Sequence, residues 1–258
     1  GTSVTMSANG KFVAVGSIGA SGYSGHVRIF RLDSLTRTWT KHGQTIIGES
    51  SSDESGKSIS LSGDGMRIAI GAPTNSGYYG HARVYEFDPE AELWIQLGTD
   101  IDGEMLGEES GYSVAFSGDG ERLAVGSPKS NNSSGHVKIY EFVGGAWMQL
   151  GPTLAGDQYY SSLGNSLALS DNGDRIVIGS RFDPQDEVRL VGAVGVFEYV
   201  AGEWLQLGSE LTGDSYYDIF GHTVDMSADG SRIVIGSPNE NYEGMDNAGM
   251  TQVREYDS

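Results

Sequence analysis

The sequence predicts an all-β protein, a five-bladed β-propeller of four-stranded antiparallel blades whose last blade is incomplete. A block of about 55 residues occurs five times, and such a period is typical of propellers and solenoids. Its copies begin at Gly1, Gly56, Gly111, Gly164 and Gly221. Within the blocks, apolar residues alternate with small polar ones, which marks half-buried strands, and the apolar spacing of three and four that a helix needs is absent.

Each block contains the signals of four strands in a fixed order, shown here for the second block. The first strand is the alternating run Ile59–Leu61, and the turn Gly63–Gly65 contains the Asp-Gly pair that favours tight hairpins. The second and third strands are Ile68–Gly71 and His81–Phe87, and the fourth carries Trp94 in a W-x-Q-L-G pattern. Four short antiparallel strands per repeat describe a propeller blade, and five blades are expected to close into a ring.

The repeats need one another to close a ring, so residues 1–258 are expected to form one domain. The blades are expected at about residues 1–50, 51–105, 106–158, 159–215 and 216–258. The fifth block ends at Ser258, just after its third strand, so blade 5 has three strands or the natural chain continues. A three-stranded blade leaves Gln252–Tyr256 as an open edge, through which another chain could associate.

Composition excludes several classes of partner. The formal charge of −19 argues against nucleic acid, which needs clusters of Lys and Arg, and favours cations or basic partners. No apolar run is long enough to span a bilayer, and the absence of cysteine excludes disulfides and thiolate metal sites. Asn131 and Asn132 each begin an N-glycosylation pattern on a predicted loop, which favours an extracellular or cell-surface location.

Several motifs point to a repeat family. Phe220-Gly221 leads to Gly236-Ser237-Pro238, and Gly71-Ala72-Pro73 spells G-A-P. The block therefore resembles the FG-GAP repeat of integrin α-subunit propellers and of many secreted microbial proteins. The combination of G-H-V-R-V-Y-E, W-x-Q-L-G and I-x-G-D/E is even more similar to large, mostly uncharacterised repeat families of diatoms and marine bacteria. The resemblance implies a propeller but says little about activity, because function lives in sites grafted on folds.

The resemblance also implies calcium, because integrin-type blades often bind it in a D-x-D/N-x-D/N-G loop between their first two strands. This chain keeps only the end of that loop, with Ser62 in place of the first acidic ligand, so the site is not carried over. The fourth block comes nearest, with Asp171, Asn172 and Asp174. Calcium, which takes six or more oxygen ligands, is the only cofactor that the sequence suggests.

The four linkers between blades share a pattern of acids. Each linker starts with an acid, and three carry a second acid four residues on. The first set comprises Glu49, Glu104, Asp157 and Asp214, and the second comprises Asp53, Glu108 and Asp218. These carboxylates are expected either to accept backbone N–H groups or pair with Arg, or to bind a metal or cationic ligand.

The linkers and the loops between second and third strands are expected to emerge on one face of the propeller. That face holds eight tyrosines, which offer flat apolar rings with polar tips for recognising sugars or proteins; alternatively several of these rings tuck between blades. They are Tyr23, Tyr78, Tyr79, Tyr159, Tyr160, Tyr216, Tyr217 and Tyr242.

Irregular segments on the same face are further candidates, because loops that break a repeat often carry function. The segment 239–247 offers oxygen ligands for a metal at Glu240, Glu243 and Asp246, although a solvated acidic loop has the same composition. His26, His81 and His136 share one repeat position in different blades, so they cannot meet at one zinc ion.

Three functions remain open on these grounds. The first is a non-catalytic propeller of the binding or adhesion type, which recognises a protein or glycan through its tyrosine-rich, acidic face. The second is a structural assembly subunit that joins partners through the incomplete blade. The third is a polysaccharide-acting enzyme with paired carboxylates near the central channel, although no pair is singled out by the sequence.

Overall fold

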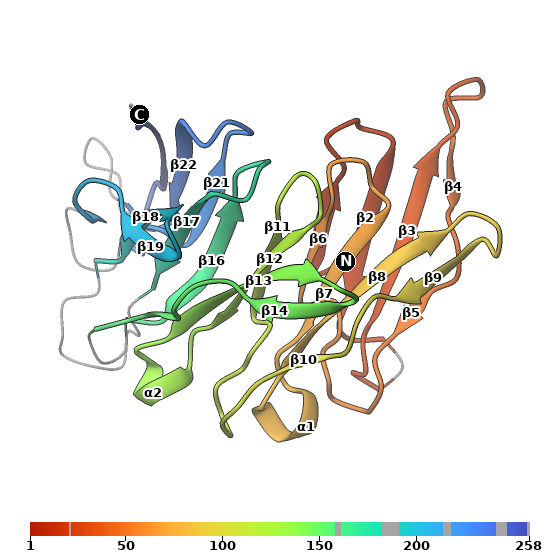
Figure 1. The fold of residues 1–258 in the computed structure, drawn as a ribbon, viewed down its shortest axis with the longest axis horizontal. Coiled ribbons are helices and arrows are strands. Elements are labelled where there is room, and N and C mark those ends of the chain that lie inside the picture. The colour runs from red at the N-terminus through yellow and green to blue at the C-terminus, as the bar shows by residue number, and fades with distance from the viewer. Residues whose placement is uncertain (21, 158–160, 182–190, 214–217, 241–246, 257–258) are drawn as a thin grey trace.

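The computed structural model describes residues 1–258 except 21, 158–160, 182–190, 214–217, 241–246 and 257–258. Five antiparallel sheets follow one another along the chain, and Figure 1 shows them in succession from red to blue. Their innermost strands pack pairwise, β1 on β6, β6 on β11, β11 on β16 and β16 on β21. The protein is therefore an all-β, five-bladed β-propeller, as predicted.

The first three strands of every blade pair in chain order. The innermost strands are β1 (Ser3–Met6), β6 (Ser58–Leu61), β11 (Ser113–Phe116), β16 (Leu163–Leu169) and β21 (Thr223–Met226). The second strands are β2 (Phe12–Ser17), β7 (Arg67–Ala72), β12 (Arg122–Ser127), β17 (Arg175–Ser180) and β22 (Arg232–Ser237). The third strands are β3 (His26–Leu32), β8 (His81–Asp88), β13 (His136–Val143), β18 (Ala193–Val200) and β23 (Met250–Glu255).

The first four blades have two more strands, both paired with the third strand. The tryptophan-bearing fourth strands are β4 (Trp39–Lys41), β9 (Leu93–Gln96), β14 (Ala146–Gln149) and β19 (Glu203–Gln206). The two-residue strands β5 (Ile46–Ile47), β10 (Ile101–Asp102), β15 (Leu154–Ala155) and β20 (Leu211–Thr212) begin the linkers and were not predicted. Blade 5 has three strands in the described part of the chain. Two single-turn helices, α1 (Asn75–Tyr78) and α2 (Ser130–Ser133), lie between second and third strands. Among the described residues, no helix combines the length and the apolar character needed to cross a bilayer.

Apolar side chains fill the space between neighbouring blades. Between blades 1 and 2, Ile29 of β3 belongs to the same buried cluster as Ile59 and Leu61 of β6. The backbones also approach closely, because a Cβ on Gly71 would lie 1.9 Å from the carbonyl oxygen of Gly111 in the next linker. Only glycine fits at such a crossing, which explains the glycine that recurs near the end of the second strand in the first four blades, at Gly16, Gly71, Gly126 and Gly179.

The tryptophans tie each blade to the one before it. Trp94 is buried, and its indole N–H donates to the carbonyl of His42 in blade 1 at 3.0 Å. Trp147 and Trp204 make the same bond to the preceding blade, at 3.0 and 2.9 Å. Each of these tryptophans thus packs between two blades and also satisfies a backbone carbonyl there.

On the opposite side of the propeller from the linkers, arginines after the first hairpin turn form a second set of ties. Arg67 pairs with Glu86 of its own blade at 2.9 Å and with Glu121 of blade 3 at 2.8 Å. Arg122 and Arg175 repeat the pairing within their own blades. In blade 1 the equivalent position is occupied by Phe12, because Lys11 lies one residue earlier.

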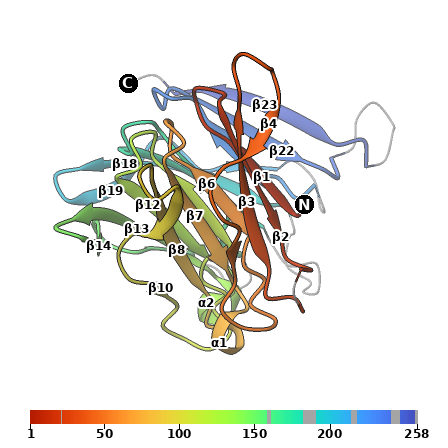
Figure 2. The same cartoon turned by 90° about the vertical axis from the view of Figure 1, so that its right-hand side faces the viewer.

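The two end blades leave one face of each sheet uncovered. Val4 and Met6 of β1 are exposed, and so are Val234 of β22 and Val253 of β23. In the described part of the chain, β21 does not pack on β1 as the other innermost strands pack on their neighbours. The expected closure into a ring is therefore wrong. Figure 2 shows blade 1, in red, at the front of the molecule.

Candidate functional site

The linkers and the loops between second and third strands meet on one face, as the topology predicted. Parallel bridges join the two kinds of segment, from Gly25 to Ser55 and from Gly80 to Ser110. This loop face lies at the lower edge of Figure 1, where α1 and α2 are visible.

Three of the predicted tyrosines are exposed on the loop face, namely Tyr23, Tyr78 and Tyr79. The other five lie outside the described residues: Tyr159, Tyr160, Tyr216, Tyr217 and Tyr242. Asn131 and Asn132 are exposed at α2 with left-handed backbone, so their glycosylation stays a prediction.

The linker acids bind groups of the protein itself. Asp53 and Glu108 are buried and accept the backbone N–H three residues earlier, at 2.6 and 3.0 Å. Glu104 pairs with Lys138 at 2.6 Å, and this hydrogen bond lowers the pKa of the Glu104 carboxyl. Asp157 is exposed, and Asp214 lies outside the described residues.

One cluster has the composition of a metal site. Ligand atoms of Glu49, His81 and Asp100 lie within 4.8 Å of one another between blades 1 and 2. Arg83 occupies this cluster, because its guanidinium contacts Glu49 and donates through Nε to Asp100 at 3.0 Å. The cation is thus already supplied by the protein, and the cluster is an ion-pair tie between blades.

The structure does not test calcium binding by the acidic segment 239–247. Glu240 is buried, whereas Glu243 and Asp246 lie outside the described residues. Calcium binding by these three residues stays a prediction. In the hairpin turns, Asp64 and Asp119 accept hydrogen bonds from Ser62 and Ser117, at 2.7 and 2.6 Å.

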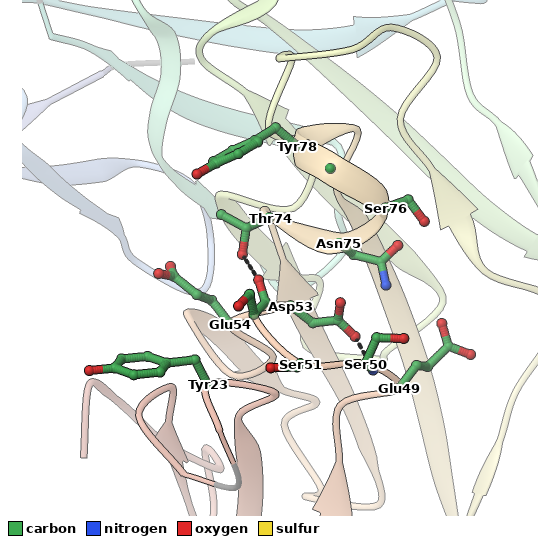
Figure 3. A pocket seen from close by; sticks show the side chains of 12 residues that line it. Tyr23, Glu49, Ser50, Ser51, Asp53, Glu54, Thr74, Asn75, Ser76 and Tyr78 are labelled. Carbon is green, nitrogen blue, oxygen red and sulfur yellow. Dashed lines mark hydrogen bonds between the residues drawn. The ribbon is translucent and has the colours of Figure 1, made fainter.

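A pocket of about 620 Å³ opens on the loop face between blades 1 and 2. Hydroxyl, amide and carboxyl groups line it, including those of Thr74, Asn75 and Asp53. Figure 3 shows Glu54 pointing to the same side as Tyr23 and Tyr78, with its carboxyl between the two rings. The pocket therefore offers flat apolar surfaces flanking a carboxylate, surrounded by hydrogen-bonding groups.

Glu54 belongs to a turn that recurs where each linker reaches an innermost strand. At four such turns one residue has a left-handed backbone with φ of 54°, namely Glu54, Glu109, Ser162 and Ile219. The carbonyl of Glu54 accepts the N–H of Lys57 at 3.0 Å, and that of Glu109 accepts the N–H of Tyr112 at 3.1 Å. The shared backbone thus presents a different side chain in each blade, at a conformation uncommon for residues other than glycine.

Four residues at these turns, together with Lys129, form what we call the mouth cluster: Glu54, Lys57, Glu109, Tyr112 and Lys129. The ammonium of Lys57 lies over the ring of Tyr112, 5.5 Å from its centroid, which joins blades 2 and 3 at the loop face. Lys129 precedes α2, at the position that Thr74 occupies before α1. Two carboxylates and two ammonium groups therefore share one partly buried region.

The electrostatics of the mouth cluster centre on Glu109. Burial is the largest effect and raises the pKa of the Glu109 carboxyl above its ordinary value. The neighbouring charges have smaller effects: Lys129 and Lys57 lower this pKa, and Glu54 raises it. Two neighbouring carboxyls in different surroundings can take different roles in proton transfer, and burial raises the pKa of Glu109. In the mouth cluster, burial and charges of both signs thus act together on one glutamate, Glu109.

The same row of positions continues into blades 4 and 5 with Asn165 and His222. The side-chain amide of Asn165 donates to the carbonyl of His222 at 3.3 Å. Burial lowers the pKa of the His222 imidazole, and its buried Nδ1 has no hydrogen-bond partner among the described residues. His222 also lines a second cavity of about 490 Å³ on blade 5.

The sequence-based search missed the mouth cluster. It weighed repeated residues, such as the first linker acids and the histidines, whereas the cluster is made of residues that differ between blades. The signal was present in the alignment of the repeats: after the invariant glycine that opens each block stand Thr2, Lys57, Tyr112, Asn165 and His222. Variable polar residues at one inward position of a constant scaffold are typical of a functional site.

Comparisons with known proteins bear on the fold. No protein-family model matches the chain, and no curated protein is similar to it in sequence. Two solved structures that resemble it are each described as a "putative 6-phosphogluconolactonase". The one from Bacteroides uniformis is 11% identical, with a TM-score of 0.54 over 97% of this chain and 88% of that one. The one from Bacteroides fragilis is 13% identical, with a TM-score of 0.53 over 98% and 84%.

A third structure is the hydrazine synthase of Kuenenia stuttgartiensis, 13% identical, with a TM-score of 0.50 over 91% of this chain and 73% of that one. At these identities the likeness shows the fold. The named neighbours are enzymes, so the expectation of a non-catalytic binding propeller is wrong against this finding. The finding supports neither of the two alternatives, an assembly subunit and a polysaccharide-acting enzyme. The FG-GAP resemblance and the extracellular location stay predictions.

Proposed function

We propose that this propeller is a hydrolase that opens small lactones at the mouth cluster. The observation that carries the proposal is Glu109, whose carboxyl has a pKa raised by burial beside a second carboxylate and two lysines. The names of two proteins that share the fold suggest the reaction class. A lactone ring needs a base for water, a cation for the oxyanion and an acid for the leaving oxygen, and the cluster contains all three.

The reaction assigns one role to each side chain. The carboxylate of Glu54 takes a proton from water as the water oxygen bonds to the lactone carbonyl carbon. The ammonium of Lys57 stabilises the negative charge that forms on the carbonyl oxygen. When the ring C–O bond breaks, protonated Glu109 gives its proton to the leaving oxygen, and the proton held by Glu54 restores Glu109. The product is a hydroxy acid, whose carboxylate Lys57 and Lys129 attract.

The adjoining pocket suggests the kind of lactone. Its described lining includes the carboxylates of Glu49, Asp53 and Glu54 and contains no Lys or Arg, so a phosphate group there would meet like charges. Neutral hydroxyl groups could instead bond to Thr74 and Asn75, and Tyr23 and Tyr78 offer flat surfaces to a sugar ring. A neutral sugar lactone therefore fits the pocket better than a phosphorylated one.

The test is a lactonase assay with purified protein, in which acid release from glucono-δ-lactone is followed against the uncatalysed rate. Glu109→Gln should lower kcat by about 100-fold or more, the usual contribution of a general acid, and Lys57→Met by about 100-fold. Glu90→Gln, an exposed acid of the β8–β9 hairpin, is the matched control and should leave kcat unchanged. Absence of any acceleration by the wild type, or full activity of Glu109→Gln, would contradict the proposal.

A further inference from the structure

The two uncovered sheet faces are the two halves of the interface that joins the blades elsewhere. Val4 and Met6 in blade 1 are 71% and 58% exposed, whereas their counterparts Ile59 and Leu61 in blade 2 are 9% and 7% exposed against blade 1. Trp39 is 44% exposed, compared with 3% for Trp94 at the same repeat position. Blade 1 thus presents the surface that each later blade buries against its predecessor.

Blade 5 presents the complementary surface. Val253 of β23 is 62% exposed and Val234 of β22 is 38% exposed. Their counterparts in blade 1, Ile29 and Ala14, are fully buried against blade 2. Contiguous apolar surface of this kind marks a site of protein association.

The two end blades carry opposite charge. Residues 1–50 contain five Lys and Arg against two acids, although the whole chain is strongly acidic, whereas residues 216–258 contain eight acids against two Arg. On the uncovered faces themselves, Arg28 of β3 is exposed on blade 1. On blade 5, Arg232 and Glu255 pair with each other at 2.8 Å, and Asp225 of β21 is the remaining exposed charge among the described residues of that face. The two faces therefore match in charge, and each face pairs poorly with a second copy of itself.

We propose that copies of this chain associate head to tail, with the blade 5 face of one copy packed on the blade 1 face of the next. This inference goes beyond the proposed hydrolysis and does not depend on it. The contact continues the blade-on-blade packing already present four times within the chain, and it joins unlike faces, so it is heterologous. One copy bound at each face extends the series of blades beyond five.

Two variants test the proposal on the full chain, and both alter exposed residues so that the fold is retained: Val4→Glu on blade 1 and Val253→Glu on blade 5. Circular dichroism should show the same spectrum for both as for the wild type. In analytical ultracentrifugation the wild-type mass should rise with concentration, and each variant alone should stay monomeric, because every head-to-tail contact needs one intact face of each kind.

An equimolar mixture of the two variants gives the decisive result. Its members retain one complementary pair of intact faces, so the mixture should form a 1:1 dimer that grows no further. A wild type that stays monomeric at about 100 µM, well above the Kd of a standard interface, would overturn the proposal. So would a variant that associates on its own, since that means like faces pair, or a mixture that remains monomeric.

Discussion

The tryptophans allow the contribution of a blade contact to be measured at one repeat position in two different blades. Trp94 is buried between blades 1 and 2, packs edge-on against Phe87 with ring centroids 5.3 Å apart and donates to His42. Trp94→Ala should therefore lower the free energy of unfolding by about 3–5 kcal/mol, the range for large-to-small aromatic replacements in cores. Trp94→Phe keeps most of the apolar contact and loses the hydrogen bond, so it should cost less, with about 1 kcal/mol from the bond itself.

Trp39→Ala is the matched control, because Trp39 sits on the uncovered face of blade 1. Nearly half of its surface is already in water, so its replacement should cost less than about 2 kcal/mol. The assay is urea unfolding followed by circular dichroism, at a concentration low enough to keep the chain monomeric, with similar m values for all variants. Equal losses for Trp39→Ala and Trp94→Ala would refute the conclusion that the blade 1 face is uncovered in the monomer.

Three further predictions concern single positions. Glu109→Gln should raise the thermal midpoint at pH 7, because the raised pKa of Glu109 means that folding disfavours its ionised carboxyl. The wild type therefore loses stability as the pH rises from about 4 through the pKa of the folded state. Below about pH 4 the carboxyl is protonated in both the folded and the unfolded state, so the gain in thermal midpoint should vanish there. Arg83→Met should destabilise by about 1–3 kcal/mol in urea unfolding, because it removes hydrogen bonds to two partly exposed carboxylates and leaves them close together between blades 1 and 2. A neutral effect would show that the ion pairs add nothing. Gly71→Ala should fail to give soluble folded protein, since the new Cβ meets the Gly111 carbonyl, and a folded Gly71→Ala protein would contradict the close crossing.

The repeat made the blades predictable from local signals alone. Alternation placed β6 and β7, the Asp-Gly pair placed the turn between them, and Trp94 marked the outer strand, because each signal acts within a few residues. The short strand β10 escaped notice, since Ile101–Asp102 is too brief to show a period. Ring closure was also wrong, because it depends on the angle between blades, which the pattern of one blade does not encode.

The candidate site was less predictable, for a physical reason. Repeated acids such as Glu104 stand out in sequence but mostly pair with neighbouring residues, here Lys138, and so maintain the scaffold. Glu109 differs from Glu104 through burial and through three charges contributed by other segments, none of which is adjacent in sequence. Its altered acidity is a property of the assembled loop face, and only the arrangement of the linkers reveals it.

Catalysis by the mouth cluster is tested most directly by the pH dependence of kcat for lactone hydrolysis, measured between pH 5 and 9 and corrected for the spontaneous reaction. With Glu109 as the acid, kcat should fall as the pH rises through the raised pKa of that carboxyl, and Glu109→Gln should lose this alkaline limb together with most of the rate. An alkaline limb that persists unchanged in Glu109→Gln would show that another group supplies the proton and that the site lies elsewhere.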